Sequence, residues 1–139
     1  MSAANTLPLI PSPISPSEAA AMNAVVLAFV GDAVYTLYMR SGLSLSTTAK
    51  AGELHRRAIQ EVCAVKQAQN MDTLMPLLNE AEAAVFRRAR NSKGGRVAKN
   101  ADLADYKKAT GLEAVIGYLY LSGQGERLAE LCDAIRIES

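Results

Sequence analysis

The chain has 139 residues, a length that fits one domain with its own hydrophobic core. Hydrophobic residues make up 50%, charged residues 21%, and there is no Trp, a composition that favours a folded helical domain over a disordered chain. The formal net charge is only +1, so any preference for nucleic acid must come from the distribution of the charges.

The cysteine and histidine content argues against a disulfide framework and a zinc site. Cys63 and Cys132 are far apart and fall in helical patterns, which indicates small core residues in a reducing compartment. There is a single His and no Cys-x-x-Cys pair. We find no apolar run of membrane-spanning length and no signal-peptide core at the N-terminus. We therefore expect a cytoplasmic protein with no membrane partner.

In chain order, residues 1–15 are rich in Pro and Ser and are expected to form a flexible lead-in to a single domain at residues 16–139. Ser15-Pro16-Ser17-Glu18 predicts a capping box and a helix to about Arg40, with a break near Asn23 and a stop at Gly42. Further helices are expected at about residues 49–70, 71–78, 79–90, 102–122 and 124–137. No segment alternates with period two, so we assign no strands and expect an all-α fold.

The stretch from Ala24 to Arg40 is the element around which this pattern is organised, because apolar residues occupy both of its faces. A helix that is hydrophobic all round is expected to be buried. Asp32 stands in its middle, directly after Gly31, and a lone buried carboxylate needs a cation, a metal or a wet cleft. The alternative is a partly exposed Asp on a helix that only resembles a buried one.

Cations are concentrated around a loop at residues 91–100. Eight of the fifteen Lys and Arg residues fall in one stretch: Arg87, Arg88, Arg90, Lys93, Arg96, Lys99, Lys107 and Lys108. A basic loop that contains Gly94-Gly95 can follow a phosphate backbone and fix its register. Few aromatic side chains are present here to stack on bases, so duplex recognition is favoured over single-strand recognition. The alternative is a solubilising loop in an otherwise acidic protein.

Glu113 is the second carboxylate of interest, because it is the only charged residue between Gly111 and Leu121. Gly111 and Gly117 weaken a helix interior, so we expect them to permit close approach of another helix or a ligand. Asp32 and Glu113 could then face each other and share a divalent ion. Hard oxygen ligands with few protein donors suit magnesium, which can support phosphodiester hydrolysis. Their separation cannot be inferred from the sequence.

Phe29-Val30-Gly31-Asp32-Ala33-Val34 resembles the signature helix of the ribonuclease III catalytic domain, and the fit is closer to the compact Mini-III branch of that family. Further matches occur in the expected order: Asn23, Leu54-His55, Val62, Ala64, Gln67-Ala68, Arg88-Ala89-Arg90-Asn91, Lys99-Asn100, Glu113-Ala114 and Gly117-Tyr118-Leu119. The resemblance implies a ribonuclease III endonuclease-domain-like helical bundle without a separate duplex-binding domain. It further implies a homodimeric endoribonuclease that uses Mg²⁺, or Mn²⁺ in its place, to cleave double-stranded RNA. The implied substrate is the precursor of large-subunit (23S) ribosomal RNA.

The resemblance also assigns roles to individual residues. Asp32 and Glu113 match the family's metal-binding catalytic acids, and Phe29 matches a position that packs across the dimer axis. Residues similar to the loop expected to touch RNA are Arg88, Arg90, Asn91, Lys93, Lys99 and Asn100. Three positions depart from the acids of full-length ribonuclease III, in keeping with the reduced set of Mini-III proteins: Val25, Ala28 and Thr110. We expect Thr110 and water to fill part of the metal shell.

Two other functions are compatible with parts of the sequence. The first is a non-catalytic ribonuclease III-like scaffold that docks on structured RNA or the ribosome, although the presence of both Asp32 and Glu113 argues against it. The second is a helical protein-interaction domain, which does not account for the basic loop. The enzyme hypothesis is the one that explains both features.

Overall fold

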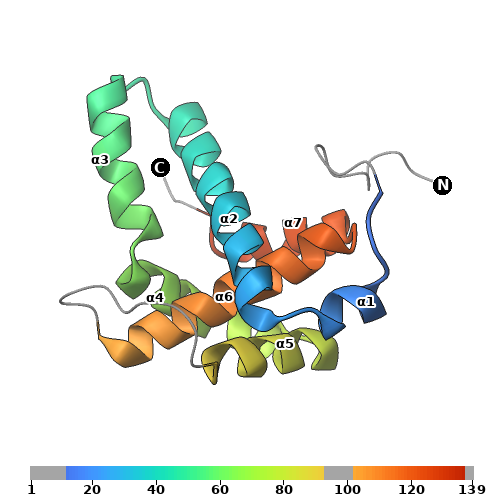
Figure 1. Cartoon of the computed structure of the whole chain (residues 1–139). Helices are drawn as coiled ribbons and strands as arrows, with labels where there is room; N and C mark the ends of the chain where they lie inside the picture. Colours follow the sequence, from blue (N-terminus) through green and yellow to red (C-terminus); the bar gives the residue numbers. More distant parts are fainter. Residues whose placement is uncertain (1–11, 93–101, 137–139) are drawn as a thin grey trace.

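The computed structural model describes residues 12–92 and 102–136, and within them it contains helices and no strands (Figure 1). In chain order the elements are α1 (Pro16–Ala21), α2 (Ala24–Ser46), α3 (Ala51–Val62), α4 (Ala64–Leu74), the 3-10 helix η2 (Met75–Leu77), α5 (Glu80–Arg90), α6 (Leu103–Leu121) and α7 (Gly125–Ala134). The expected all-α fold is confirmed. Most of the expected lead-in and of the basic loop lies outside the described residues, and the division at residue 15 stays a prediction.

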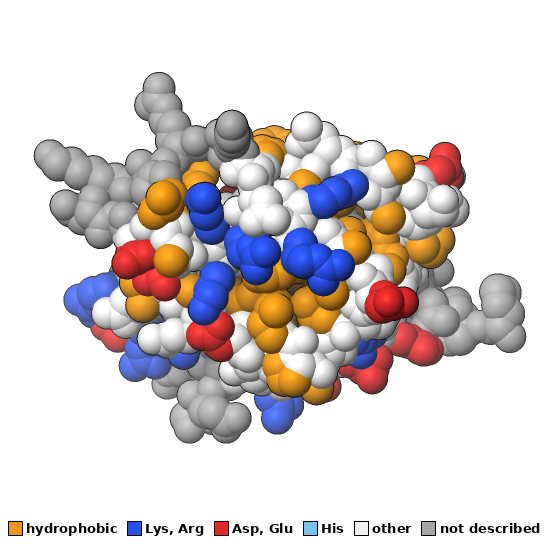
Figure 2. All heavy atoms as spheres, turned by 90° about the horizontal axis from the view of Figure 1, so that it is seen from below, with side chains coloured by type: hydrophobic (Ala, Val, Ile, Leu, Met, Phe, Trp, Pro, Cys, Tyr) orange, Lys and Arg blue, Asp and Glu red, His pale blue; other side chains and the backbone are white. Residues whose placement is uncertain are grey.

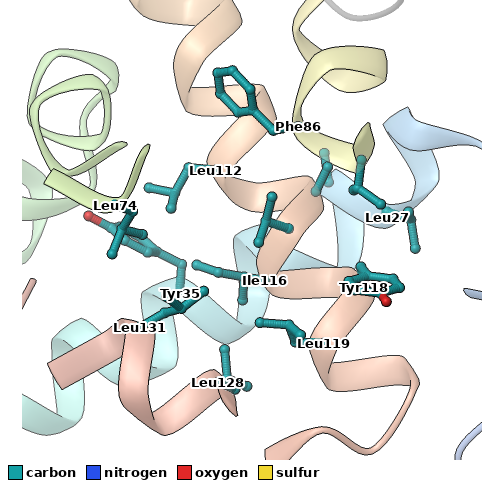
Figure 3. Packing of buried hydrophobic residues seen from close by; sticks show 14 of the residues in the cluster. Leu27, Tyr35, Leu74, Phe86, Leu112, Ile116, Tyr118, Leu119, Leu128 and Leu131 are labelled. Atoms are coloured by element: carbon teal, nitrogen blue, oxygen red, sulfur yellow. The ribbon is translucent and has the colours of Figure 1, made fainter. Parts of the chain in front are cut away.

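α6 lies at the centre of the fold, with α2, α4, α5 and α7 packed around it (Figure 1). Its buried residues lie on all sides of the helix: Ala109, Gly111, Leu112, Ala114, Val115, Ile116, Gly117, Tyr118 and Leu119. Figure 3 shows Leu112, Ile116 and Leu119 of α6 packed within the hydrophobic core, next to side chains from the surrounding helices. α6 is therefore the element against which α2, α4, α5 and α7 are positioned, whereas α3 packs on α2 and α4.

Glycines allow α2 and α6 to cross with their backbones in contact. A Cβ atom at Gly31 would clash with the backbone carbonyl of Glu113, and one at Gly117 would clash with the backbone of α2. A Cβ atom at Gly111 would clash with the ring of Phe86, a side chain of α5. The close approach expected at Gly111 and Gly117 is thus confirmed. The crossing of α2 and α6 also brings Asp32, which follows Gly31, close to Glu113.

The start of α1 and the break before α2 follow the sequence pattern. The Ser15 hydroxyl accepts from the backbone N–H of Glu18, and the Ser15 N–H donates to the Glu18 carboxylate, each over 3.1 Å. Asn23 then caps α2, because its side-chain oxygen accepts from the N–H groups of Val25 and Val26. The predicted capping box and the break near Asn23 are both confirmed.

Three other expected boundaries are wrong. The separate helix expected at residues 71–78 is the end of α4, which runs to Leu74, followed by η2. α2 runs through Gly42 to Ser46, so this glycine is part of the helix rather than its stop. The helix expected at residues 49–70 is two helices, because the extended backbone of Cys63 (ψ 159°) separates α3 from α4. Hydrophobic spacing gives no signal for such a turn when neither Gly nor Pro marks it. Cys63 is also exposed rather than a core residue, whereas Cys132 is buried.

α2 is buried on one face only, contrary to the expectation for a helix that is apolar all round. Its buried residues are Leu27, Ala28, Gly31, Tyr35, Met39 and Leu43, while Phe29 is 80% exposed and Leu37 61% exposed. Taken alone, this 23-residue helix, with a mean hydropathy of 1.2, has the length and composition of a membrane span. The expectation that no apolar run reaches that length is therefore wrong. In the fold, α2 packs along α6 and α3.

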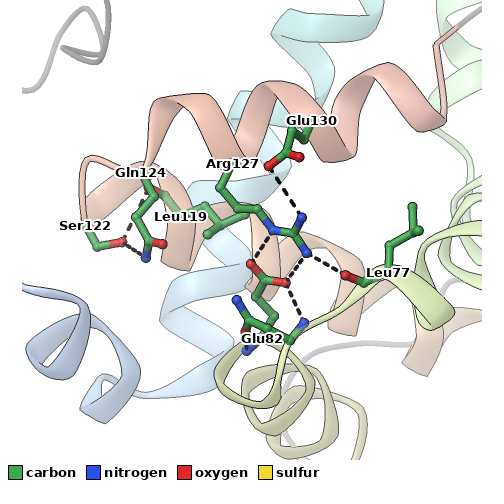
Figure 4. Close-up of polar contacts among 8 residues, drawn as sticks. Leu77, Glu82, Leu119, Ser122, Gln124, Arg127 and Glu130 are labelled. Atoms are coloured by element: carbon green, nitrogen blue, oxygen red, sulfur yellow. Dashed lines mark hydrogen bonds and ion pairs between the residues drawn. The ribbon is translucent and has the colours of Figure 1, made fainter. Parts of the chain in front are cut away.

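A buried ion pair joins α5 to α7 (Figure 4). The Glu82 side chain is fully buried, and Arg127 donates to its two oxygens through Nε over 2.8 Å and Nη2 over 2.9 Å. Burial alone raises the pKa of Glu82, but hydrogen bonds from Arg127 and from the backbone of Asn79 bring it below its ordinary value. The Glu82 carboxylate therefore caps α5 and at the same time fixes α7.

Candidate active site

Asp32 and Glu113 line one pocket, close to the crossing of α2 and α6. The pocket has a volume of about 270 Å³, and the same two helices supply its other lining residues: Val25, Ala28, Phe29, Tyr106 and Thr110. Asp32 is exposed, which agrees with the alternative of a partly exposed Asp and not with a buried one. Glu113 is partly buried. The structure thus brings together the two acids that the sequence singled out.

The surroundings of Glu113 favour its protonated form. Burial raises the pKa of Glu113 to about 8, and a hydrogen bond with Asp32 and the charge of Asp32 act in the same direction. The amide of Gln67, which donates to Glu113 Oε2 over 3.3 Å, acts in the opposite direction. At neutral pH Glu113 therefore retains a proton, which a cation between the two carboxylates would displace.

The donor set suits a hydrated divalent ion. Within residues 12–92 and 102–136 there is no group of three or more His, Cys, Asp or Glu side chains that could hold a metal. The two carboxylates and the Thr110 hydroxyl are hard oxygen donors, and Mg²⁺ binds through one or two carboxylates while it keeps several waters. The Thr110 hydroxyl donates to the Tyr106 carbonyl over 3.0 Å, so its oxygen can still act as an acceptor. Asp32, Glu113 and Thr110 are therefore the residues that would hold Mg²⁺ or Mn²⁺.

The sequence pattern gave no role to two residues of the site, Tyr106 and Gln67. Tyr106 lies seven residues before Glu113 and Thr110 three residues before it, so helical spacing alone places all three on one face of α6. Gln67 reaches Glu113 from α4, a separate helix. No local sequence pattern predicts a contact between these two helices. Gln67 appeared in the sequence analysis only as one of the residues that match the family.

The described residues among the expected RNA contacts lie at the end of α5. Arg88 Nη2 donates to the Met22 carbonyl over 2.9 Å, and the Arg90 guanidinium lies 5.4 Å from the centre of the Phe86 ring. Asn91 accepts a hydrogen bond from Arg90 Nε over 3.2 Å. These contacts occupy part of each guanidinium and leave further N–H donors for a ligand. The other expected contacts, Lys93, Lys99 and Asn100, lie outside the described residues.

Figure 2 views the molecule from the α5 side, and Lys and Arg side chains gather in the middle of this face around hydrophobic side chains. The last turn of α5 carries Arg87, Arg88 and Arg90, and cations there also oppose the helix dipole. Asp and Glu side chains lie toward the margins of the same view. The charge distribution on this face is suited to a polyanion.

Phe29 lies beside the carboxylate pocket on the exposed face of α2. It also borders a shallow depression of about 890 Å³, whose lining residues are Ala21, Met22, Asn23, Ala24, Val25, Val26, Phe29, Arg88 and Ser92. An exposed aromatic ring next to an apolar depression is typical of a surface that another molecule covers.

Comparison with known proteins assigns the chain to a family. Residues 25–124 match the model of the ribonuclease III domain. The chain is 50% identical over 109 residues to Mini-ribonuclease 3 of Brevibacillus brevis, a match that covers 78% of this chain and 81% of that protein. It is 46% identical over 110 residues to Mini-ribonuclease 3 of Symbiobacterium thermophilum, with 79% and 85% covered.

A solved structure has the same fold. The crystal structure of protein FN1578 from Fusobacterium nucleatum superimposes with a TM-score of 0.74 at 27% identity, covering 83% of this chain and 92% of that one. The family match includes α2 and α6, the two helices that carry the paired carboxylates. The chain therefore belongs to the ribonuclease III family of endoribonucleases, as a relative of the Mini-ribonuclease 3 proteins.

Proposed function

We propose that this chain is a magnesium-dependent endoribonuclease that hydrolyses phosphodiester bonds in double-stranded RNA. The observation that carries the proposal is the meeting of Asp32 and Glu113 in one pocket, with the pKa of Glu113 raised to about 8. A strongly perturbed carboxylate in a cleft, such as Glu113, is more typical of a functional site than of a structural one. The similarity to Mini-ribonuclease 3 proteins supports the reaction class.

The two acids differ in what they contribute. Asp32 is exposed on α2, so its carboxylate is accessible to solvent and to a substrate. Glu113 projects from the buried part of α6, and the contact at Gly31 fixes its backbone against α2. Bound between them, Mg²⁺ or Mn²⁺ would supply Lewis-acid stabilisation of the charge that develops during phosphodiester hydrolysis.

The substrate face would be the α5 side of the molecule. Arg88, Arg90 and Asn91 would contact phosphates and fix the register of the duplex, and we propose that Lys93, Lys99 and Asn100 extend this surface. Such contacts predict that the affinity for RNA falls steeply with salt concentration, because bound phosphates release counterions. We further propose, from the family resemblance, that the physiological substrate is the 23S ribosomal RNA precursor and that the enzyme is cytoplasmic.

We propose that two copies pair through the exposed face of α2. Phe29 and Leu37 are both large, apolar and mostly exposed there, and a two-fold axis would let each copy cover the other. The depression beside Phe29 would receive the ring of the second copy. Sedimentation should show a dimer for the parent protein and a monomer for Phe29→Lys, while a monomeric parent would contradict the pairing.

Cleavage of a long RNA duplex in Mg²⁺ tests the function. The parent should cut, and Asp32→Asn should lower the rate on the order of 100- to 1,000-fold, because metal stabilisation is worth several kcal/mol. Binding to the duplex should be retained by Asp32→Asn. The control is Asp133→Asn, which neutralises an exposed acid on α7 and should cut at the parental rate.

Each alternative predicts a different result for the parent protein. A scaffold would bind the duplex without cutting it in Mg²⁺ or Mn²⁺. A protein-interaction domain would not bind the duplex at all. Either result would overturn the proposed activity.

A further inference from the structure

Gln67 is a buried polar residue that connects the paired carboxylates to the junction between α3 and α4. It is only 3% exposed, although it lies on α4 and not on either of the helices that carry the acids. Its Nε2 donates to the Val62 carbonyl over 3.0 Å and to Glu113 Oε2 over 3.3 Å. Both hydrogen atoms of the amide nitrogen are therefore used.

The Val62 carbonyl fixes which way the amide faces. A backbone carbonyl only accepts hydrogen bonds, so the alternative orientation of Gln67 would place two oxygens against each other. The nitrogen is thereby directed to the Val62 carbonyl, and its second N–H is presented to Glu113. The Val62 carbonyl, at the end of α3, thus ensures that Gln67 presents an N–H donor to Glu113.

This orientation of the amide leaves its oxygen without a hydrogen bond from any described residue, which destabilises the fold. Gln67 Oε1 is buried and has no hydrogen-bond partner in the described part of the chain. An unsatisfied buried acceptor destabilises a fold by about 1–3 kcal/mol. An apolar side chain of the same size would avoid that penalty. A buried polar atom that the fold tolerates at such a cost calls for an explanation other than packing.

We propose that Gln67 is a positioning residue for the metal-binding acid: it holds Oε2 of Glu113 and so presents the rest of the carboxylate to a divalent ion. This inference rests on the proposed function, because it assumes that Glu113 is a ligand. Residues that orient a metal ligand by hydrogen bonding typically change metal affinity or activity about 10- to 100-fold when they are replaced. Gln67 does not touch the substrate in this account, so its effect is exerted through Glu113.

The test compares Gln67→Met with the parent and with Gln69→Met. Met has a similar length and no donor, so Gln67→Met removes both hydrogen bonds and the unsatisfied oxygen together. Gln69 is two residues further along α4 and exposed, which makes it a matched control for the substitution itself. The first readout is Mn²⁺ binding to the RNA-free protein by titration calorimetry, and the second is kcat and KM on a long RNA duplex.

Gln67→Met should raise the Mn²⁺ dissociation constant about 10-fold or more and lower kcat by a similar factor, with KM for the duplex unchanged. Its thermal unfolding without metal should stay close to that of the parent, because loss of the unsatisfied Oε1 offsets loss of the hydrogen bond to the Val62 carbonyl. Gln69→Met should match the parent in every measurement. A purely structural glutamine would give the opposite result, with a lower unfolding temperature and unchanged metal binding.

Failure of the inference is distinguishable from failure of the proposed function. If the parent binds Mn²⁺ and cuts while Gln67→Met does the same equally well, only the inference is overturned. If the parent binds no Mn²⁺, the proposed function is overturned and the inference with it. Should Gln67→Met not fold, parent crystals soaked in Mn²⁺ decide instead. In them the Gln67 amide should still donate to metal-bound Glu113, and an amide turned away from Glu113 overturns the inference.

Discussion

Replacing Gly31 by Ala should destabilise the protein, because the added Cβ would overlap the backbone carbonyl of Glu113 where α2 crosses α6. The obstructing atoms are backbone atoms of the central helix, so a side-chain rotation cannot relieve the clash. Overpacking of this kind costs about 1–3 kcal/mol, and we expect the upper end. The intrinsic helix preference of Ala over Gly offsets about 1 kcal/mol. The net loss should therefore be about 2 kcal/mol.

Gly42→Ala is the matched control, because Gly42 lies on the same helix and nothing lies within 4 Å of its added Cβ. This variant should gain about 1 kcal/mol from helix preference alone. The difference between the two variants, about 3 kcal/mol, isolates the effect of the crossing. In thermal unfolding it corresponds to a separation of roughly 10 °C for a domain of this size.

Urea and thermal unfolding of both variants measure this difference. Gly31→Ala should also lower duplex cleavage, because any separation of the helices moves Asp32 away from Glu113. If Gly31→Ala proved as stable as Gly42→Ala, the two backbones would not be in contact, and the geometry of the site would be wrong.

Two further predictions concern charges. Arg127→Met leaves the buried Glu82 carboxylate unpaired and should lower the free energy of unfolding in urea by about 3–5 kcal/mol. Arg57→Met, which breaks an exposed pair with Glu53, should change it by less than about 1 kcal/mol, and equal losses would contradict this account. Without divalent ions, the free energy of unfolding should fall as pH rises from 4.5 to about 8, because the folded state holds a proton on Glu113 that the unfolded state releases. Glu113→Gln should remove that part of the pH dependence, and an unchanged slope would show that the folded state does not retain this proton.

Much of the fold could be predicted because its signals are local. The start of α1 follows from Ser15 and Glu18, which bond reciprocally as the spacing indicates. The break at Cys63 could not be predicted, since its extended backbone redirects α4 without a Gly or Pro. The ion pair of Glu82 could not be predicted either, because its partner Arg127 lies 45 residues away on another helix.

The two acids could be predicted for a physical reason. An isolated carboxylate in an apolar helix is unfavourable without a partner, and the neighbouring glycines indicated that a second backbone comes close. The exposure of Asp32 could not be predicted, because the apolar residues on the outer face of α2 resemble a buried helix. That face includes Phe29, and only the folded chain shows that no other part of its described residues covers the ring. The contact of Gln67 with Glu113 required the relative placement of α4 and α6.

The most direct test of the account is the anomalous diffraction signal from crystals soaked in Mn²⁺. We predict a Mn²⁺ peak in the pocket between α2 and α6, within about 2.0–2.2 Å of an oxygen from each of Asp32 and Glu113. Under the same soak, crystals of Asp32→Asn should show a weaker peak or none. A parent crystal whose Mn²⁺ binds elsewhere, or contacts only one of the two acids, would contradict the claim that the pair holds the ion.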